Sequence, residues 1–182
     1  EVKRKELGIE NKFVIGHIGR FSYPKNHKRI INIFKAVSRK NKNAVLLLVG
    51  VGELEKQIKD QVESYGLSDK VKFLGLRSDI PQLLMAMDVF LMPSHFEGLP
   101  VAGIEAQTTG LRCIFSDAVT KETDITGLCE FISLKESDDY WAERVLLPYE
   151  RKDVSELILG SGYDVAEGAD WLIKFYEGVY NE

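Results

Sequence analysis

Apolar and polar residues follow two different periods along this chain, and the two periods alternate. Residues 13–21 (FVIGHIGRF) and 44–50 (AVLLLVG) are apolar runs typical of strands covered on both faces. Between them, apolar residues recur at helical spacing among lysines and arginines, at Ile30, Ile31, Ile33, Phe34 and Val37. The pattern predicts a strand, a helix and a second strand in this order.

The same alternation continues through most of the chain. It predicts helices over 53–65, 80–87 and 100–109, and strands over 71–75, 89–94, 112–117 and 129–134. From residue 137 onward the pattern is helical, with packing candidates at Trp141, Val145, Leu146, Trp171, Ile173, Phe175 and Tyr176. The run Gly160-Ser161-Gly162 interrupts it and precedes a final helix over 163–180.

Strands that alternate with helices at this spacing indicate βαβ units. The sequence therefore predicts an α/β fold with a Rossmann-like parallel sheet and helices on both faces. The 182 residues suit a single domain, 1–182. In such folds, ligands bind outside the carboxyl ends of the strands. This rule points to the loops at 19–26, 50–53, 75–79, 94–99 and 116–123.

Composition narrows the classes of protein. The chain is 45% hydrophobic and 29% charged with a formal net charge of −4, so its overall balance gives no reason to expect a nucleic-acid partner. No apolar run reaches the roughly 20 residues of a membrane span. No signal-peptide pattern is present, so we expect a cytoplasmic location. Cys113 and Cys129 lie in strand-like apolar runs and are predicted to be buried.

The stretch SHFEGLPVAGIEAQ, residues 94–107, carries the most informative chemistry. Gly98 is predicted to permit a sharp turn, and Pro100 fits the first position of the following helix. The free N–H groups at such a helix start form an anion site. Glu97 and Glu105 flank this start, and carboxylates accept hydrogen bonds from sugar hydroxyls. A phosphate between two hydroxyl-bearing rings would use both glutamates and the helix terminus.

The loop GRFSYPKN supplies the cations that a phosphate needs. Arg20 offers a bidentate fork and Lys25 a point charge, a pair suited to a diphosphate. Gly19 would let the backbone approach a ligand closely. Solvated loop charges are the alternative for both cations. The turn VGVGEL at 49–54 is neither a G-x-G-x-x-G fingerprint nor a P-loop, which disfavours a dinucleotide-dependent dehydrogenase.

The histidines are predicted to have mainly structural roles. His17 lies inside the first strand and is expected to pack there, whereas His27 opens a basic helix and is expected to be exposed. His95 either packs or faces the cleft. No cluster of histidine, cysteine and aspartate has metal-ligand spacing, so we expect no metal site.

The charged clusters are predicted to be solvated. This applies to the basic helix over 27–42, with attraction to an anionic membrane surface as its alternative, and to the adjacent Asp138 and Asp139.

Four segments together resemble a known family in their order and spacing: GRFSYPKN, LLLVGVGEL, VKFLGLRSDIPQLLMAMDVFLMPS and FEGLPVAGIEAQTTG. The chain resembles the C-terminal, donor-binding domain of bacterial retaining GT-B glycosyltransferases of the large capsule and exopolysaccharide family, glycosyl transferases group 1. The likeness covers residues 5–135. It implies one half of a GT-B fold that binds a nucleotide-diphosphate sugar, with no metal or cofactor, for retaining transfer of a hexose to a glycan or lipid-linked acceptor.

The resemblance also implies roles for individual residues. Arg20 and Lys25 would neutralise the donor diphosphate, Glu97 would contact the hexose hydroxyls, and Glu105 would accept from the ribose hydroxyls. The other implied donor-binding positions line the loops: Gly19, Gly52, Leu76, Arg77, Gly98, Leu99, Pro100 and Val101. Glu122 would match an acidic position after the fifth strand.

The family's acceptor site lies in an N-terminal domain that this chain is expected to lack. The isolated domain is therefore expected to bind a donor without transferring sugar. The stripe from Trp171 to Tyr176 belongs either to the core or to a contact with that domain. A lipid-linked acceptor would bring peripheral contact with the inner face of the membrane.

Three positions depart from the family pattern. Lys25-Asn26 replaces the usual Lys-Gly, and asparagine tolerates a positive φ nearly as glycine does. The segment DAVTKETD replaces a glycine-rich turn, and Pro100 stands where a glycine is more common.

Other functions stay open beside the transferase. One is a nucleotide-sugar epimerase of the same architecture, for which His95 is the candidate for proton transfer. Another is a non-catalytic nucleotide-sugar-binding module. A glycosidase built on Glu97 and Glu105 is disfavoured because the neighbouring cations favour phosphate over a neutral glycoside.

Overall fold

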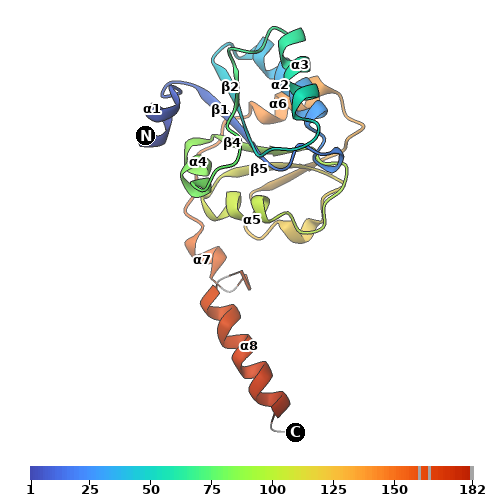
Figure 1. Ribbon diagram of the computed structural model, residues 1–182. Coiled ribbons are helices and arrows are strands. Elements are labelled where there is room, and N and C mark those ends of the chain that lie inside the picture. Colours follow the sequence, from blue (N-terminus) through green and yellow to red (C-terminus); the bar gives the residue numbers. More distant parts are fainter. Residues whose placement is uncertain (160, 164, 181–182) are drawn as a thin grey trace.

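The computed structural model describes residues 1–159, 161–163 and 165–180. A six-stranded sheet has the order β3-β2-β1-β4-β5-β6, and each neighbouring pair of strands is parallel (Figure 1). The strands are β1 Phe13–Ile18, β2 Ala44–Val49, β3 Val71–Phe73, β4 Val89–Met92, β5 Arg112–Ser116 and β6 Cys129–Ile132. The parallel sheet confirms the predicted fold class.

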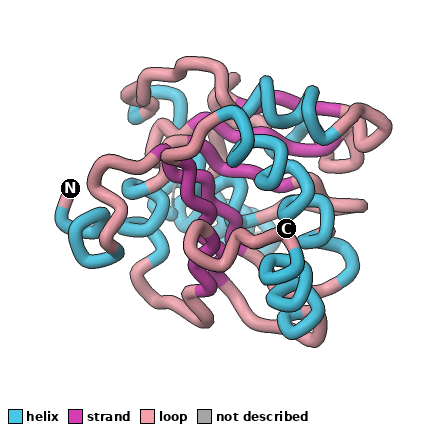
Figure 2. Tube along the Cα trace, turned by 90° about the horizontal axis from the view of Figure 1, so that it is seen from above, coloured by secondary structure: helices cyan, strands magenta, loops and turns pink. Residues whose placement is uncertain are grey.

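The helices lie between and after these strands. They are α1 Val2–Leu7, α2 His27–Lys40, α3 Glu55–Ser64, α4 Ile80–Ala86, α5 Val101–Thr108, α6 Asp138–Val145, α7 Ser155–Ile158 and α8 Val165–Tyr180, with short 3₁₀ turns η1 Tyr23–Lys25 and η2 Lys121–Thr123. Seen from above in Figure 2, helices lie on both sides of the strands. Each predicted strand ends earlier than expected, because the chain leaves the sheet to form the loops of one edge.

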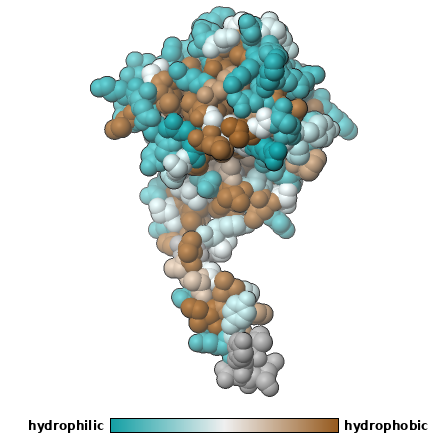
Figure 3. Space-filling view, in the orientation of Figure 1, coloured by the Kyte–Doolittle hydropathy of each residue, from teal (hydrophilic) through white to brown (hydrophobic). Residues whose placement is uncertain are grey.

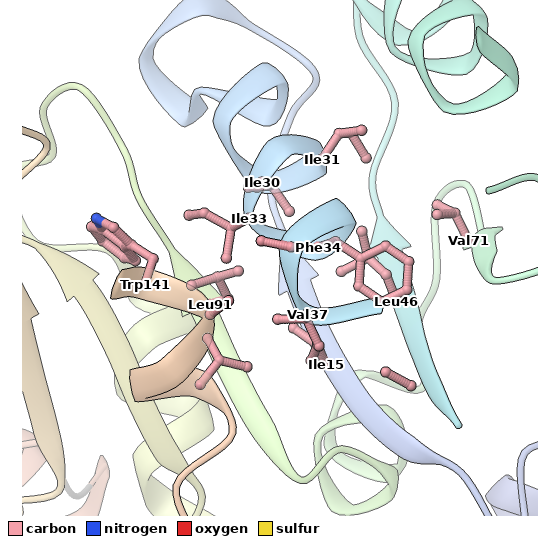
Figure 4. Close-up of a cluster of buried hydrophobic side chains, with 14 of the residues drawn as sticks. Ile15, Ile30, Ile31, Ile33, Phe34, Val37, Leu46, Val71, Leu91 and Trp141 are labelled. Carbon is pink, nitrogen blue, oxygen red and sulfur yellow. The ribbon is translucent and has the colours of Figure 1, made fainter. Parts of the chain in front are cut away.

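Successive strand residues point to opposite faces of the sheet and enter two hydrophobic clusters. Ile15, Leu46 and Leu91 pack under α2, α3 and α6, where Trp141 is fully buried (Figure 4). Val14 and Phe90 face the other way, toward α4 and α5. Burial on both faces explains why these strands read as continuous apolar runs rather than alternating ones.

The strand order reverses direction between β1 and β4. The chain builds outward from β1 through β2 to β3, and then returns to place β4 on the other side of β1. Because all strands are parallel, their carboxyl ends share one edge, and the loops after β1 and β4 meet at the reversal. This is the position where ligands bind in open α/β sheets.

The basic face of α2 packs against an acidic α6. The side chains of Arg29 and Arg39 lie 3.1 Å from the carboxylates of Asp138 and Asp139, respectively. Further along the same helix pair, Lys40 lies 3.0 Å from a carboxylate oxygen of Glu143. Most of these charges are solvated as predicted, but they also form interhelical ion pairs, and Arg29 is largely covered, at 21% exposed.

The C-terminal helix α8 extends away from the sheet (Figure 1), and apolar side chains gather along α7 and α8 in Figure 3. Trp171, Ile173, Phe175 and Tyr176 are all exposed, with Trp171 at 63%. The core alternative for this stripe is therefore wrong, because α8 has no sheet face to cover. Contact with another domain stays a prediction. Gly160 of the predicted break lies outside the described residues.

Two further sequence expectations concern burial. Cys113 is buried as predicted, whereas Cys129, its neighbour across β5 and β6, is half-buried. Across the described ranges, every helix is too short or too polar to span a bilayer.

Candidate functional site

Lys25 and Glu97 meet at the point where the strand order reverses. Lys25 ends η1 in the loop after β1, and Glu97 lies in the loop after β4. The Lys25 ammonium is 2.7 Å from a carboxylate oxygen of Glu97, and the two side chains are only 21% and 12% exposed. The structure thus brings together two residues that the sequence separates by more than seventy positions.

Hydrogen bonds to the backbone hold these two loops in register. The Asn26 side-chain amide donates to the Pro93 carbonyl at 2.9 Å, and the His95 N–H donates to the Pro24 carbonyl at 2.8 Å. Asn26 is left-handed, with φ +53°, which turns the chain from η1 into α2. This confirms the prediction that asparagine substitutes for the usual glycine.

Glycines allow the loops after β1 and β2 to run in backbone contact. Gly50 has φ +132°, and a Cβ there would lie 2.2 Å from the Gly19 carbonyl oxygen. A Cβ on Gly52 would lie 2.4 Å from the Phe21 carbonyl oxygen. The Phe21 N–H donates to the Val51 carbonyl at 3.1 Å, which closes the seam between the two loops.

Arg20 lies on the same edge of the sheet but at its rim. Its side chain is 73% exposed, and its guanidinium is 3.2 Å from the Glu53 carboxylate. The pKa of Glu53 is lowered, first by a hydrogen bond from its own backbone N–H and then by the charge of Arg20. In the structure Arg20 is thus paired with Glu53, whereas Lys25 is paired with Glu97.

Helix α5 starts just after Glu97, in the loop that follows β4. Pro100 is extended, with ψ 104°, and precedes the first helical residue, Val101, so its predicted place inside the helix is wrong by one position. Within α5 and its cap, all of which the structure describes, no side chain caps the helix start. Its first N–H groups are thus available to an anion.

Gly98 does not behave as predicted. Its φ is outside the left-handed region, so the turn does not require glycine's conformational freedom. A Cβ there would enter open space, which leaves room beside the exposed side chain of Leu99. Glu97 also pairs with Val119 as an isolated parallel bridge, so the loop after β5, which carries the exposed Glu122, lies beside it.

The two glutamates of the motif differ in environment. Glu97 is held in its ion pair, whereas Glu105 lies one turn into α5 with its side chain exposed to solvent. Glu105 shares its exposed helix face with Val101, four residues earlier. The assigned roles of both glutamates stay predictions.

Arg77 is engaged with two acidic residues. Its guanidinium donates two 2.7 Å hydrogen bonds to the Asp79 carboxylate and lies 3.5 Å from Glu6 of α1. Hydrogen bonds from Arg77 and Lys3 hold the pKa of Asp79 well below its ordinary value. Leu76, another of the predicted donor-binding residues in this loop, has a free side chain that is 78% exposed.

His27 is buried, so its predicted exposure is wrong. The left-handed turn before it directs the first residue of α2 inward, where the ring stacks on Phe21 with centroids 4.1 Å apart. Burial, and then the charge of Lys25, lowers the pKa of His27 to about 4. His17 is buried in β1 as predicted, and His95 stacks on Tyr23 at 4.6 Å.

These features suit a diphosphate with sugars on both sides. Two cations and an uncapped helix start face one edge, and carboxylates suited to hydroxyl groups lie beside them. Within the described part of the chain, no group of three or more histidine, cysteine, aspartate or glutamate side chains could hold a metal ion. Groups at this edge that could supply countercharge to a phosphate include Arg20, Lys25 and the first N–H groups of α5.

Known proteins match this chain over most of its length. The family model for glycosyl transferases group 1 matches residues 1–146. The protein named EpsF in Bacillus subtilis (strain 168) is 34% identical over 172 residues, which are 91% of this chain and 45% of that protein. The UDP-Gal:alpha-D-GlcNAc-diphosphoundecaprenol alpha-1,3-galactosyltransferase of Escherichia coli is 39% identical over 121 residues, which are 64% of this chain and 31% of that enzyme.

Solved structures share the fold. The crystal structure of Anabaena Alr3699/HepE in complex with UDP and glucose superimposes with a TM-score of 0.81 at 23% identity, over 97% of this chain and 51% of that one. This chain thus spans about half the length of the proteins it matches. The sheet is one half of a GT-B fold, and the chain belongs to the glycosyl transferases group 1 family.

Proposed function

We propose that this chain is the donor-binding half of a retaining glycosyltransferase that moves a hexose from a nucleotide-diphosphate sugar to a glycan or lipid-linked acceptor. The observation that carries the proposal is the Lys25–Glu97 pair at the reversal of strand order, next to the uncapped start of α5. Membership of the family supports the transferase class.

The proposed chemistry follows from charge. Breaking a glycosyl–phosphate bond builds positive charge on the sugar and negative charge on the departing diphosphate. Arg20, Lys25 and the first N–H groups of α5 would stabilise that negative charge, and donors arranged before the reaction lower its barrier. These groups supply the countercharge without a metal. Glu97 would then accept hydrogen bonds from the hexose hydroxyls, and Glu105 from the ribose.

We infer that the base is uracil. The HepE structures hold UDP, UDP with glucose, or UDP-glucose, and the name of the E. coli relative specifies UDP-Gal. In the loop after β3, the exposed side chain of Leu76 could cover the ring of such a base.

We infer that the acceptor is bound by a further domain. The relatives are more than twice as long as the matched region, and the exposed apolar stripe of α8 is suited to such a contact. A cytoplasmic location, at the inner face of the membrane for a lipid-linked acceptor, fits a nucleotide-sugar donor. The epimerase alternative is not favoured, because His95 is stacked on Tyr23 and the family is a transferase family.

Calorimetry on the 182-residue chain with UDP, GDP and ADP tests the proposal. We expect UDP to bind best, and Arg20→Ala and Glu105→Ala each to weaken it by about tenfold, the value of a charge-assisted hydrogen bond. Arg39→Ala is the matched control, since Arg39 is also an exposed arginine in an ion pair, but on the α2–α6 surface. Unchanged UDP affinity in both site variants would refute the assignment.

A further inference from the structure

The imidazole of His17 has one ring nitrogen whose partner the fold does not supply. Its Nδ1 lies 2.9 Å from the Leu91 carbonyl oxygen. A carbonyl only accepts, so Nδ1 carries the proton and Nε2 presents a lone pair. Nε2 is buried and, among the described residues, has no hydrogen-bond partner. Burying an acceptor in this way costs free energy, which calls for an explanation.

The unpaired nitrogen and the side chain of Lys25 both lie close to Gly19. A Cβ built on Gly19 would lie 2.9 Å from His17 Nε2, and 3.2 Å and 3.3 Å from Cδ and Cε of Lys25. The lysine stem and the ring nitrogen therefore border the same small space above the Gly19 backbone. The ring of His27 lies edge-on to His17 at 4.8 Å, and Phe90 lies parallel to it at 6.3 Å.

We propose that His17 is a positioning residue for Lys25, whose ammonium donates to His17 Nε2 when the donor diphosphate draws Lys25 away from Glu97. This rests on the proposed donor site. A neutral acceptor orients the Lys25 ammonium and leaves its positive charge in place. A carboxylate would neutralise that charge. Burial, and then electrostatic interaction with the neighbouring His27 and Lys25, holds the pKa of His17 well below its ordinary value, so the ring stays neutral.

Two substitutions separate the two ring nitrogens. His17→Asn keeps a donor near the Nδ1 position for the Leu91 carbonyl but removes the acceptor near Nε2. His17→Gln keeps a polar atom near the Nε2 position. With UDP as the probe, we expect His17→Asn to weaken binding by about tenfold, and His17→Gln to restore most of the loss.

A double-mutant cycle with Lys25→Met tests whether His17 acts through Lys25. Met keeps an unbranched stem over Gly19 and removes the ammonium. We expect His17→Asn to have no further effect on UDP affinity in the Lys25→Met background. The same loss in both backgrounds, or wild-type affinity in His17→Asn alone, would overturn the proposal.

The melting temperature of each variant, and His27→Phe as a control, account for general effects on the fold. His27→Phe changes the ring beside His17 but leaves Nε2 and Lys25 in place, so UDP affinity near pH 8 should not change. A loss in this variant as large as in His17→Asn would indicate loosened packing and overturn the proposal. If the wild-type chain does not bind UDP at all, the donor-site proposal has failed. If it does bind and the cycle shows no coupling, only the role of His17 has failed.

Discussion

The Lys25 ammonium and the Glu97 carboxylate form a largely buried ion pair, 2.7 Å apart, between the loops after β1 and β4. A diphosphate that reaches this edge must compete with Glu97 for the lysine. The free site therefore holds its cation in place at some cost in affinity for the ligand, since part of the lysine's charge is already neutralised.

Glu97→Gln should release Lys25 and tighten the binding of UDP by about fivefold, the equivalent of about 1 kcal/mol. UDP-hexose should gain less, because the substitution also removes the acceptor proposed for the hexose hydroxyls. Calorimetry with both ligands gives the two ratios. Equal affinities of wild type and variant for UDP would show that the ion pair does not oppose the diphosphate.

Gly50→Ala should destabilise the fold and abolish UDP binding. A Cβ would lie 2.2 Å from the Gly19 carbonyl oxygen, and backbone atoms there cannot move without displacing the loop of Arg20 and Lys25. We expect a loss of at least about 3 kcal/mol in the free energy of unfolding. Urea denaturation measures this.

Gly66→Ala is the matched control for that variant. Gly66 also has a positive φ, +64°, but a Cβ there would meet nothing within 4 Å. Gly66→Ala should lower the free energy of unfolding by only about 1–2 kcal/mol, the cost of an alanine in the left-handed conformation, and should leave UDP binding intact. If both variants lost the same free energy of unfolding, the loss would come from the positive φ of the replaced glycine and not from the contact between the two loops.

Arg151→Ala should lower the stability of the chain without affecting the site around Lys25 and Glu97. The Arg151 guanidinium donates to the carbonyls of Leu84, Met87 and Thr109, at 3.1, 2.7 and 2.6 Å, and so satisfies the ends of α4 and α5. Removing it should cost about 2–4 kcal/mol in the free energy of unfolding. Lys152→Ala, at the exposed next residue, should stay within about 0.5 kcal/mol of wild type. A much smaller loss of stability in Arg151→Ala would mean that water molecules replace these hydrogen bonds.

His27 should make stability fall as the pH is lowered. Its pKa is about 4 in the folded chain, below the ordinary 6.5, so between these values only the unfolded chain takes up the proton. This proton costs about 1.4 kcal/mol of stability per pH unit across that window and nothing above it. His27→Phe removes the titration and keeps the stack on Phe21. Its urea midpoints between pH 4 and 8 should show a shallower dependence than wild type, and parallel curves would contradict the neutral state of His27.

The sequence predicts the sheet and the place of the site because both depend on local signals. Two-sided apolar strands give the sheet, and the carboxyl-end rule points to the loops that hold Lys25 and Glu97. Even the left-handed turn at Asn26 follows from residue type. The direction of a side chain at a helix start does not follow from such local signals. The sequence places His27 first in an exposed basic helix, whereas in the structure the turn before His27 directs its ring inward onto the buried Phe21.

The sequence does not predict the ion pairs of α2, because the acidic residues that pair with its cations belong to α6, a hundred positions later. The sequence predicts a turn that needs glycine at Gly98. In the structure its φ lies outside the left-handed region, and only its lack of a side chain shapes the surface. The ligand contact of Arg77 stays a prediction, and in the structure its guanidinium donates two hydrogen bonds to Asp79, two residues later.

The seam between the loops after β1 and β2 divides this edge of the sheet into a fixed and a variable part. Gly50, Gly52 and Phe21 are locked by backbone contact, so replacements there are penalised by loss of the fold itself. Leu76 and Leu99 project into solvent and support nothing behind them. Replacements of the Leu76 and Leu99 side chains therefore need not disturb the backbone contacts that hold the loop of Lys25 in place.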